Sequence, residues 1–139
     1  MKRILPMLAL SLCLLMPALA SATKLPDGFI ALTDREMPWA DAKAWCESQG
    51  GRLPLVGGLA RWDGKNPPAK GISIDGFGVA GDASWPPPGV RDDTYWTGTE
   101  RFDDSSWVVE GGDTRDTRDK ISVSSTRKSN DRGVICVPK

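Results

Sequence analysis

The stretch Trp39-Ala-Asp-Ala-Lys-Ala-Trp-Cys-Glu-Ser-Gln-Gly-Gly-Arg-Leu-Pro54 predicts a single helix with a clear end. Trp39, Ala42 and Cys46 recur at i, i+3 and i+7, so they share one face of that helix. The two glycines of the stretch end it, because glycine readily takes the left-handed conformation that follows a helix. The buried face of the helix therefore carries an aromatic ring, a small residue and a thiol.

The N-terminus has the pattern of a secretory signal peptide. Basic residues near the start precede a mainly apolar run over residues 4–16, and small residues offer cleavage after Ala20 or Ala22. The apolar run is too short for a stable membrane span. We therefore expect residues 1–22 to be removed and residues 23–139 to form one exported domain, without membrane insertion.

Cys46 and Cys136 are the cysteines that remain once Cys13 leaves with this signal. Two cysteines in an exported protein usually pair. Such a bond would join the first helix to the last apolar run of the chain and contribute roughly 4–5 kcal/mol by loop closure. The alternative is a pair of unrelated buried thiols. A lipid anchor at Cys13 is disfavoured, because Leu12 stands where a small residue is needed.

Composition excludes several classes of function. Loss of Lys2 and Arg3 with the signal leaves a slightly acidic chain, which argues against a nucleic-acid-binding surface. The chain contains no histidine, which excludes hydrolysis with a histidine base and histidine-ligated metal sites. Carboxylate chemistry stays open, but Asp92-Asp93 and Asp103-Asp104 are adjacent pairs whose side chains tend to point apart. We expect a non-enzymatic protein without a cofactor or metal.

Short apolar or alternating segments predict strands on both sides of the helix. Turn signals lie between several of them, at residues 103–104 and 110–113. The later segments should form an antiparallel meander, which gives an α+β fold with one main N-terminal helix and short antiparallel strands. The expected strands are residues 28–33, 94–99, 106–110, 121–125 and 134–137, with a small strand at residues 71–75.

Residues 56–94 predict a long irregular insertion that is nevertheless ordered. The segment is rich in glycine and proline and is long for a loop. Trp62, Phe77 and Trp85 make it too aromatic for a disordered linker. The two tryptophans either staple the insertion to the body of the domain or present an aromatic surface to a ligand. The sequence leaves both alternatives open.

The helix and several later segments are weak motifs singly, but they follow one another in a specific order. Together they resemble the C-type lectin-like fold, in the bacterial form of the receptor-binding C-terminal domains of intimins and invasins. That family joins its first helix to its last strand by a disulfide, so the resemblance also implies the Cys46–Cys136 bond. The matching segments are Trp39–Cys46, Gly50–Pro54, Tyr95–Glu100, Ser106–Val109 and Gly133–Val137.

The chain departs from the calcium-dependent sugar-binding members of that family. Those members carry a Glu-Pro-Asn or Gln-Pro-Asp triplet and a later Trp-Asn-Asp triplet, and neither occurs here; Asn130-Asp131 is the nearest remnant. We interpret the loop aspartates as ordinary turn and surface residues. The resemblance therefore implies a fold more than a ligand.

We expect an exported binding module that recognises a protein, such as a cell-surface receptor, or a glycan, through the region of residues 56–94. Its destination would be the periplasm or the cell surface, with a role in adhesion. The alternative is a periplasmic inhibitor or immunity-type protein that blocks a hydrolase or toxin. The expected ligand-binding residues are Trp62, Phe77, Trp85, Asp92 and Asp93.

Overall fold

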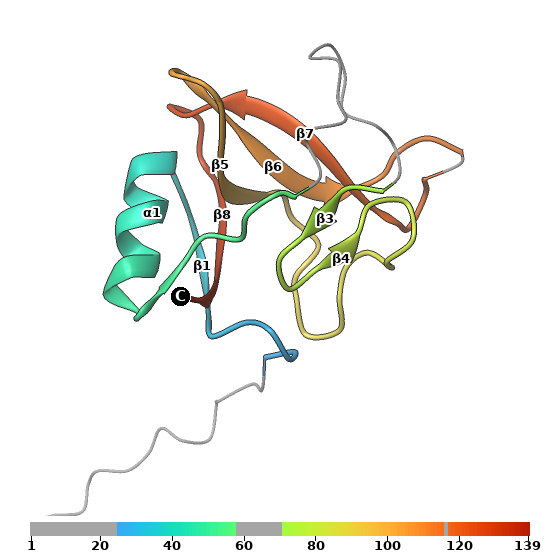
Figure 1. Cartoon of the computed structure of the whole chain (residues 1–139), viewed down its shortest axis with the longest axis horizontal. Coiled ribbons are helices and arrows are strands. Elements are labelled where there is room, and N and C mark those ends of the chain that lie inside the picture. The colour runs from blue at the N-terminus through green and yellow to red at the C-terminus, as the bar shows by residue number, and fades with distance from the viewer. Residues whose placement is uncertain (1–24, 58–70, 116) are drawn as a thin grey trace, which may run out of the picture.

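The computed structural model describes residues 25–57, 71–115 and 117–139. The predicted signal peptide and Trp62 lie outside these residues. The described chain is an α+β structure, mostly β-sheet with one short helix (Figure 1). Its elements are β1 (Ala31–Met37), α1 (Trp39–Ser48), β2 (Gly51–Arg52), β3 (Ser73–Ile74), β4 (Gly78–Val79), β5 (Tyr95–Phe102), β6 (Ser105–Gly111), β7 (Ile121–Arg127) and β8 (Arg132–Pro138).

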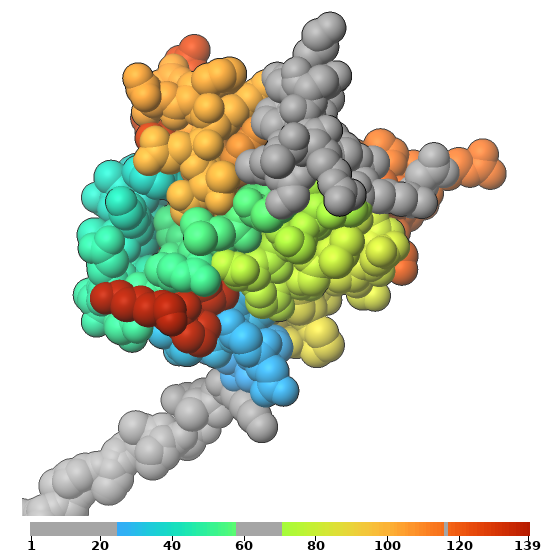
Figure 2. Space-filling view, in the orientation of Figure 1, coloured from blue at the N-terminus to red at the C-terminus, as the bar shows by residue number. Residues whose placement is uncertain are grey.

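The main sheet has the strand order β1-β8-β5-β6-β7, and β2 pairs with β8 at one end. Strands β5, β6 and β7 form the predicted antiparallel meander, but the last strand, which was expected to continue it, does not. The last strand, β8, lies between the first strand and this meander. It is antiparallel to β1 and parallel to β5. The first and last described segments therefore lie side by side (Figure 2).

The first strand was misplaced by the sequence prediction. It runs from Ala31 to Met37, about three residues later than expected. Its second half is polar, at Asp34-Arg35-Glu36, and this is why an apolar pattern missed it. Pairing with β8 holds this half in place, since Met37 lies opposite Arg132 after an irregularity in the register. The remaining long strands fall where they were predicted, with ends that differ by a few residues.

Helix α1 confirms the predicted buried face. Trp39, Ala42 and Cys46 are its buried residues. The helix ends at Ser48, and Gly50 follows in the left-handed region with φ of +85°. This conformation turns the chain into β2, and Leu53 then enters the core.

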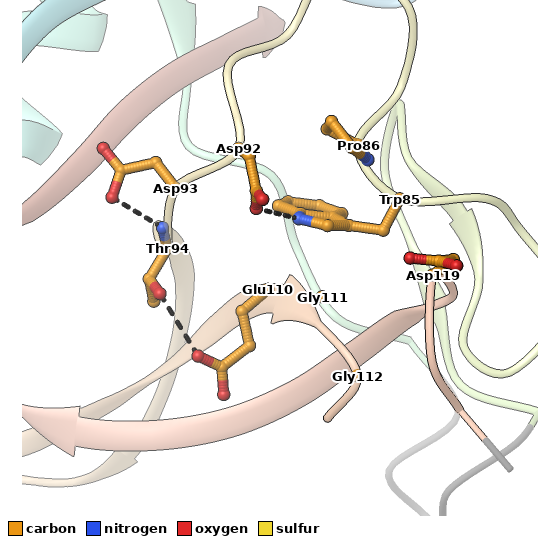
Figure 3. A pocket seen from close by; sticks show the side chains of 9 residues that line it. All are labelled: Trp85, Pro86, Asp92, Asp93, Thr94, Glu110, Gly111, Gly112 and Asp119. Carbon is orange, nitrogen blue, oxygen red and sulfur yellow. Dashed lines mark hydrogen bonds between the residues drawn. The ribbon is translucent and has the colours of Figure 1, made fainter. Parts of the chain in front are cut away.

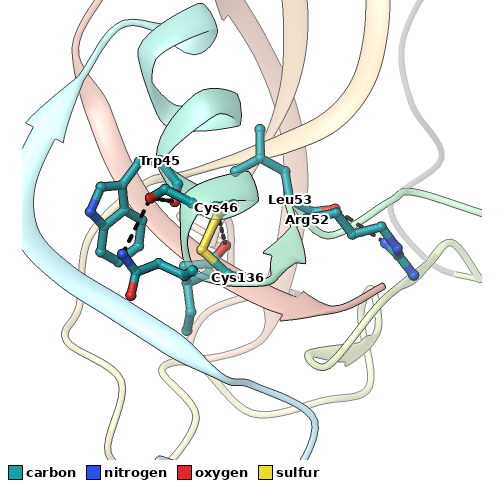
Figure 4. The surroundings of a disulfide bond; sticks show 8 residues. Trp45, Cys46, Arg52, Leu53 and Cys136 are labelled. Atoms are coloured by element: carbon teal, nitrogen blue, oxygen red, sulfur yellow. Dashed lines mark hydrogen bonds between the residues drawn. A yellow bond between two sulfur atoms is a disulfide. The ribbon is translucent and has the colours of Figure 1, made fainter.

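The Cys46–Cys136 disulfide is present and joins α1 to β8 across 90 positions of sequence (Figure 4). The two Cα atoms are 5.5 Å apart, and both residues are fully buried. The bond therefore fixes the helix against β8, an interior strand of the sheet.

The two faces of the sheet are covered by different structures. Residues of α1 pack with Trp96, Val108 and Val134 on one face. On the other face, residues of the insertion pack with Trp107 and Val109. Neighbouring residues of one strand, such as Val108 and Val109, thus enter different cores because side chains alternate along a strand. The insertion behaves as a second layer over the sheet.

The described part of the insertion is ordered by pairing and by packing. Its hairpin, β3 with β4, was predicted only in its first half. An ion pair of 2.7 Å between Arg52 and Asp75 ties this hairpin to β2, and the same carboxylate oxygen accepts the Leu55 N–H at 3.1 Å. Ile74 of this hairpin and Ile72 just before it are buried.

Candidate functional site

Trp85 lies at the centre of the insertion's core. Its ring stacks on Phe77, with centroids 5.6 Å apart and 22° between the planes. Tyr95 lies beside both rings, at 6.3 Å from Phe77 and 6.2 Å from Trp85. Phe77 is 6% exposed and Trp85 is 7% exposed. Burial of this kind supports the stapling alternative, because neither ring forms an exposed aromatic platform.

One edge of the Trp85 indole nevertheless borders a hollow in the surface (Figure 3). Its Nε1–H donates a hydrogen bond of 2.8 Å to Asp92 Oδ1. Gly111 lies against the indole, and a Cβ at this position would overlap the ring. The glycine in β6 therefore allows the ring to form part of the pocket wall. The pocket has a volume of about 460 Å³.

A second pocket, of about 310 Å³, adjoins the first. Asp93, Thr94 and Glu110 line both pockets. The second pocket continues over β7 and the start of β8. We call the two pockets together the acidic groove; its carboxylates are Glu36, Asp92, Asp93, Glu110, Asp119 and Asp131. Among the described residues that line it, Arg132 is the one basic residue.

Glu110 is held in a defined position at the middle of the groove. Its Oε2 accepts a hydrogen bond of 3.1 Å from Thr94 Oγ1, and its Oε1 accepts one of 2.7 Å from Ser124 Oγ. Asp93 caps the same segment, because its Oδ1 accepts the Thr94 N–H at 2.8 Å. The carboxylates of β6 and of the loop before β5 are thus connected through Thr94.

Glu36 faces Asp93 across the groove. The negative charge of Asp93 is the main cause that raises the pKa of Glu36, and the slight desolvation of this exposed side chain and hydrogen bonding to Asp93 act in the same direction. Asp131 also raises this pKa, while Arg132 lowers it. Two carboxylates this close cannot both be ionised without mutual repulsion. Around Glu36 the groove therefore carries more negative than positive charge.

Arg91 offsets only part of this negative charge. Its Nη2 lies 3.6 Å from Asp93 Oδ2, and the Arg91 side chain is 48% exposed. An ion pair this long and this exposed contributes little.

The Arg91 carbonyl also accepts a hydrogen bond of 2.8 Å from the Tyr95 hydroxyl. Burial, followed by the charge of Asp93, raises the pKa of Tyr95 to about 12.

The expected site residues thus separate into three groups. Trp62 lies outside the described residues. Phe77 is in the core, and a ligand could contact it only if the core opened. Asp92 and Asp93 lie together in the acidic groove, with the edge of Trp85 beside them.

Sequence reasoning missed Glu36, Glu110 and Asp119 as parts of the same site. They lie far apart in the chain, on β1, at the end of β6 and in the loop before β7. Local patterns could identify Glu110 and Asp119 only as turn residues. One signal was available: Glu36 is a charge within a segment that becomes a strand, and such charges point to an exposed edge.

The acidic groove is accessible to solvent. Glu36 is exposed and the pockets are open to solvent, so water would screen the charges of a bound substrate. Across residues 25–57, 71–115 and 117–139, no group of three or more acidic or cysteine side chains is arranged to hold a metal ion. What the groove offers is an array of hydrogen-bond acceptors with a net negative charge.

Comparison with protein-family models, with curated proteins and with solved structures gives no match for this chain. In the part of the chain that the structure describes, no helix has the length and apolarity needed to cross a membrane.

Proposed function

We propose that this protein is an exported, non-enzymatic binding module that recognises a cationic segment of a partner protein through the acidic groove. The main support for this proposal is that two adjoining pockets share Asp93, Thr94 and Glu110 in their walls. Charge complementarity of this kind steers a partner toward the site and fixes its register.

In this proposal the insertion forms only part of the recognition surface, whereas the sequence analysis assigned that surface to the insertion alone. Residues 56–94 contribute Trp85, Asp92 and Asp93 to one wall of the groove, and the strands of the main sheet supply the rest. A protein ligand suits this site better than a glycan. Sugar recognition commonly uses an exposed aromatic face, and in the described residues Trp85 offers only an edge.

The proposal also includes that the protein has a C-type lectin-like scaffold and that it is exported. The scaffold is supported by the disulfide between the first helix and the last strand, the link that the sequence resemblance implied. Export is supported by the same bond, because disulfides persist in oxidising compartments. It is also supported by the signal-peptide pattern of residues 1–22.

A defined cationic probe tests the groove directly. Binding of a short lysine-rich peptide, measured by titration calorimetry, should weaken as salt is added, because salt screens exposed charges. Asp93→Asn and Glu110→Gln should each lower the affinity by up to about fivefold, the range of an exposed charge pair. Asp104→Asn removes a carboxylate from the β5–β6 turn, outside the groove, and is the matched control.

Two results would remove the proposal. One is equal binding of a glutamate-rich peptide, and the other is equal loss of affinity in the Asp104→Asn control. A pull-down from a periplasmic extract, with Glu110→Gln as control, distinguishes an adhesive module from the alternative of an inhibitor. An inhibitor should recover a single enzyme and abolish its activity, whereas an adhesive module should recover a surface protein without such an effect.

A further inference from the structure

Beyond Ile121, the outer edge of β7 has no backbone hydrogen-bond partner among the described residues. β7 is the last strand in the order β1-β8-β5-β6-β7, and it pairs with β6 over its whole length without a register shift. Residues 121–126 contain neither a charge nor a proline. Proteins usually protect such edges with charges, prolines or bulges. The opposite edge, β1, has both charges at residues 34–36 and an irregular register.

The hydrogen bonds of Ile121 establish which backbone groups of β7 point outward. Its N–H donates to the Ala83 carbonyl at 2.8 Å, and its carbonyl accepts from the Gly81 N–H at 3.0 Å. Both groups therefore point away from β6. Backbone groups alternate between the two sides of an antiparallel strand. Those of Val123 and Ser125 consequently point to the outer side as well.

A segment of the chain itself already occupies the first part of this edge. The Trp85 N–H donates to the Asp119 carbonyl at 2.8 Å, and Ser84 forms an antiparallel bridge with Lys120. The segment turns away at Gly81. Among the described residues, no hydrogen bond continues this pairing to Val123 and Ser125. The edge thus pairs with a neighbouring segment at one end, and at the other end it has no backbone partner among the described residues.

The open part of the edge lies beside the acidic groove. Ser124, Ser125 and Thr126 line its second pocket. The Glu110 carboxylate reaches over β7, where it accepts the hydrogen bond of 2.7 Å from Ser124 Oγ. A strand added to β7 would lie about 4.8 Å from it. A lysine on the groove face of that strand could therefore reach Glu110, while residues between the lysines would face Val123 on the other side.

We propose that the partner binds as an extended segment that adds to the outer edge of β7 at Val123 and Ser125, with basic side chains at alternate positions over the acidic groove. This inference rests on the proposed function and specifies its binding mode. Backbone hydrogen bonds along the edge give affinity, and the alternate side chains give specificity.

The probe for this mode is a short peptide in which valine and lysine alternate, with blocked ends. One control peptide has the same sequence with N-methyl groups on alternate residues, which keeps the charge but prevents strand pairing. The protein variants are Ser125→Pro and Ser125→Ala. Both lose the hydrogen bond of 2.8 Å that Ser125 Oγ accepts from Arg101. Only the proline also removes the outward N–H and blocks the edge.

We expect the valine–lysine peptide to bind the native protein and to perturb the amide resonances of Val123 and Ser125. N-methylation of the peptide and the Ser125→Pro substitution should each lower the affinity about tenfold or more, a change of about 1.4 kcal/mol. Ser125→Ala should stay within about twofold of the native protein. Val123→Pro with Val123→Ala serves as a second matched pair should Ser125→Pro fail to fold.

The strand-addition mode is overturned if binding depends on Asp93 and Glu110 but is unchanged by N-methylation of the peptide. In that case the groove binds cations, and the proposed function survives without this mode. Equal binding of a valine–glutamate peptide would overturn both. A concentration-dependent dimer in sedimentation that Ser125→Pro dissociates would assign the edge to a second copy of the chain instead.

Discussion

The indole Nε1 of Trp85 donates a hydrogen bond of 2.8 Å to Asp92 Oδ1 and so joins the core of the insertion to the wall of the acidic groove. The ring is stacked on Phe77, while the carboxylate lies at the surface. Packing of the aromatic core therefore sets the position of a groove residue. Changes at Trp85 should act on stability and on the groove at the same time.

Trp85→Ala should destabilise the domain by roughly 3–5 kcal/mol, as expected when a buried aromatic ring is truncated. Trp107→Ala is the matched control, because Trp107 is a buried ring in β6 with 1% exposure. Chemical denaturation should give similar losses for both variants. A loss below about 1 kcal/mol for Trp85→Ala, with peptide binding abolished, would instead support the aromatic-platform alternative.

Glu36→Gln should stabilise the protein at neutral pH. Since the pKa of Glu36 is raised in the folded state, folding favours its protonated form. The stability from this group is present below its ordinary value of 4.5 and is lost as the pH rises through the raised pKa. The groups that face Glu36 are Asp93, Asp131 and Arg132.

The measurement is the melting temperature of both proteins as a function of pH. Glu36→Gln should melt above the native protein at pH 7, and the difference should shrink as the pH falls toward the ordinary pKa of a carboxylate. Asp34→Asn, an exposed change on the same strand, provides the comparison. A constant difference at all pH values would contradict the repulsion between Glu36 and Asp93.

Tyr95 should titrate at unusually high pH. Burial raises its pKa from 10.0 to about 12, so folding favours the neutral phenol. The stability from this group is complete below pH 10 and is lost between pH 10 and about 12. Tyr95 is the one tyrosine in the chain, so phenolate absorbance reports it alone. Unfolded protein in denaturant is the control, and a folded midpoint near 10 would contradict the burial.

Removal of the disulfide should lower the free energy of unfolding by roughly 2–5 kcal/mol. The double variant Cys46→Ala with Cys136→Ala avoids a free thiol. Chemical denaturation of this variant, and of the native protein with and without reductant, measures the effect. In the mature protein, titration should find no reactive thiol until the bond is reduced. Reactive thiols in the oxidised native protein would contradict the bond.

Part of the fold follows from local sequence because its causes are local. The buried face of α1 depends on the spacing of Trp39, Ala42 and Cys46, which the helical repeat alone determines. Gly50 ends the helix because of its own backbone freedom. The strands of the meander are short apolar or alternating segments that lie between clear turn signals. Each of these features is set by residues within a few positions of one another.

The first strand and the role of Trp85 depend on distant residues and could not be predicted in this way. Asp34-Arg35-Glu36 becomes a strand because β8 supplies its pairing partner, which outweighs the weak strand preference of the charged residues. Trp85 is buried because Phe77, Tyr95 and Gly111 surround it. These residues lie in different elements, so the sequence pattern leaves both alternatives for the ring open.

The sequence by itself determined the helix, the meander, the cysteine pair and the position of Asp92-Asp93 in a loop. Only the tertiary structure decided that these two aspartates share a groove with Glu36 and Glu110. The physical reason is that β8 inserts between β1 and β5, which brings the chain's first and last strands to the meander. Carboxylates from distant segments then converge, so the fold brings together negative charges that lie apart in the unfolded chain.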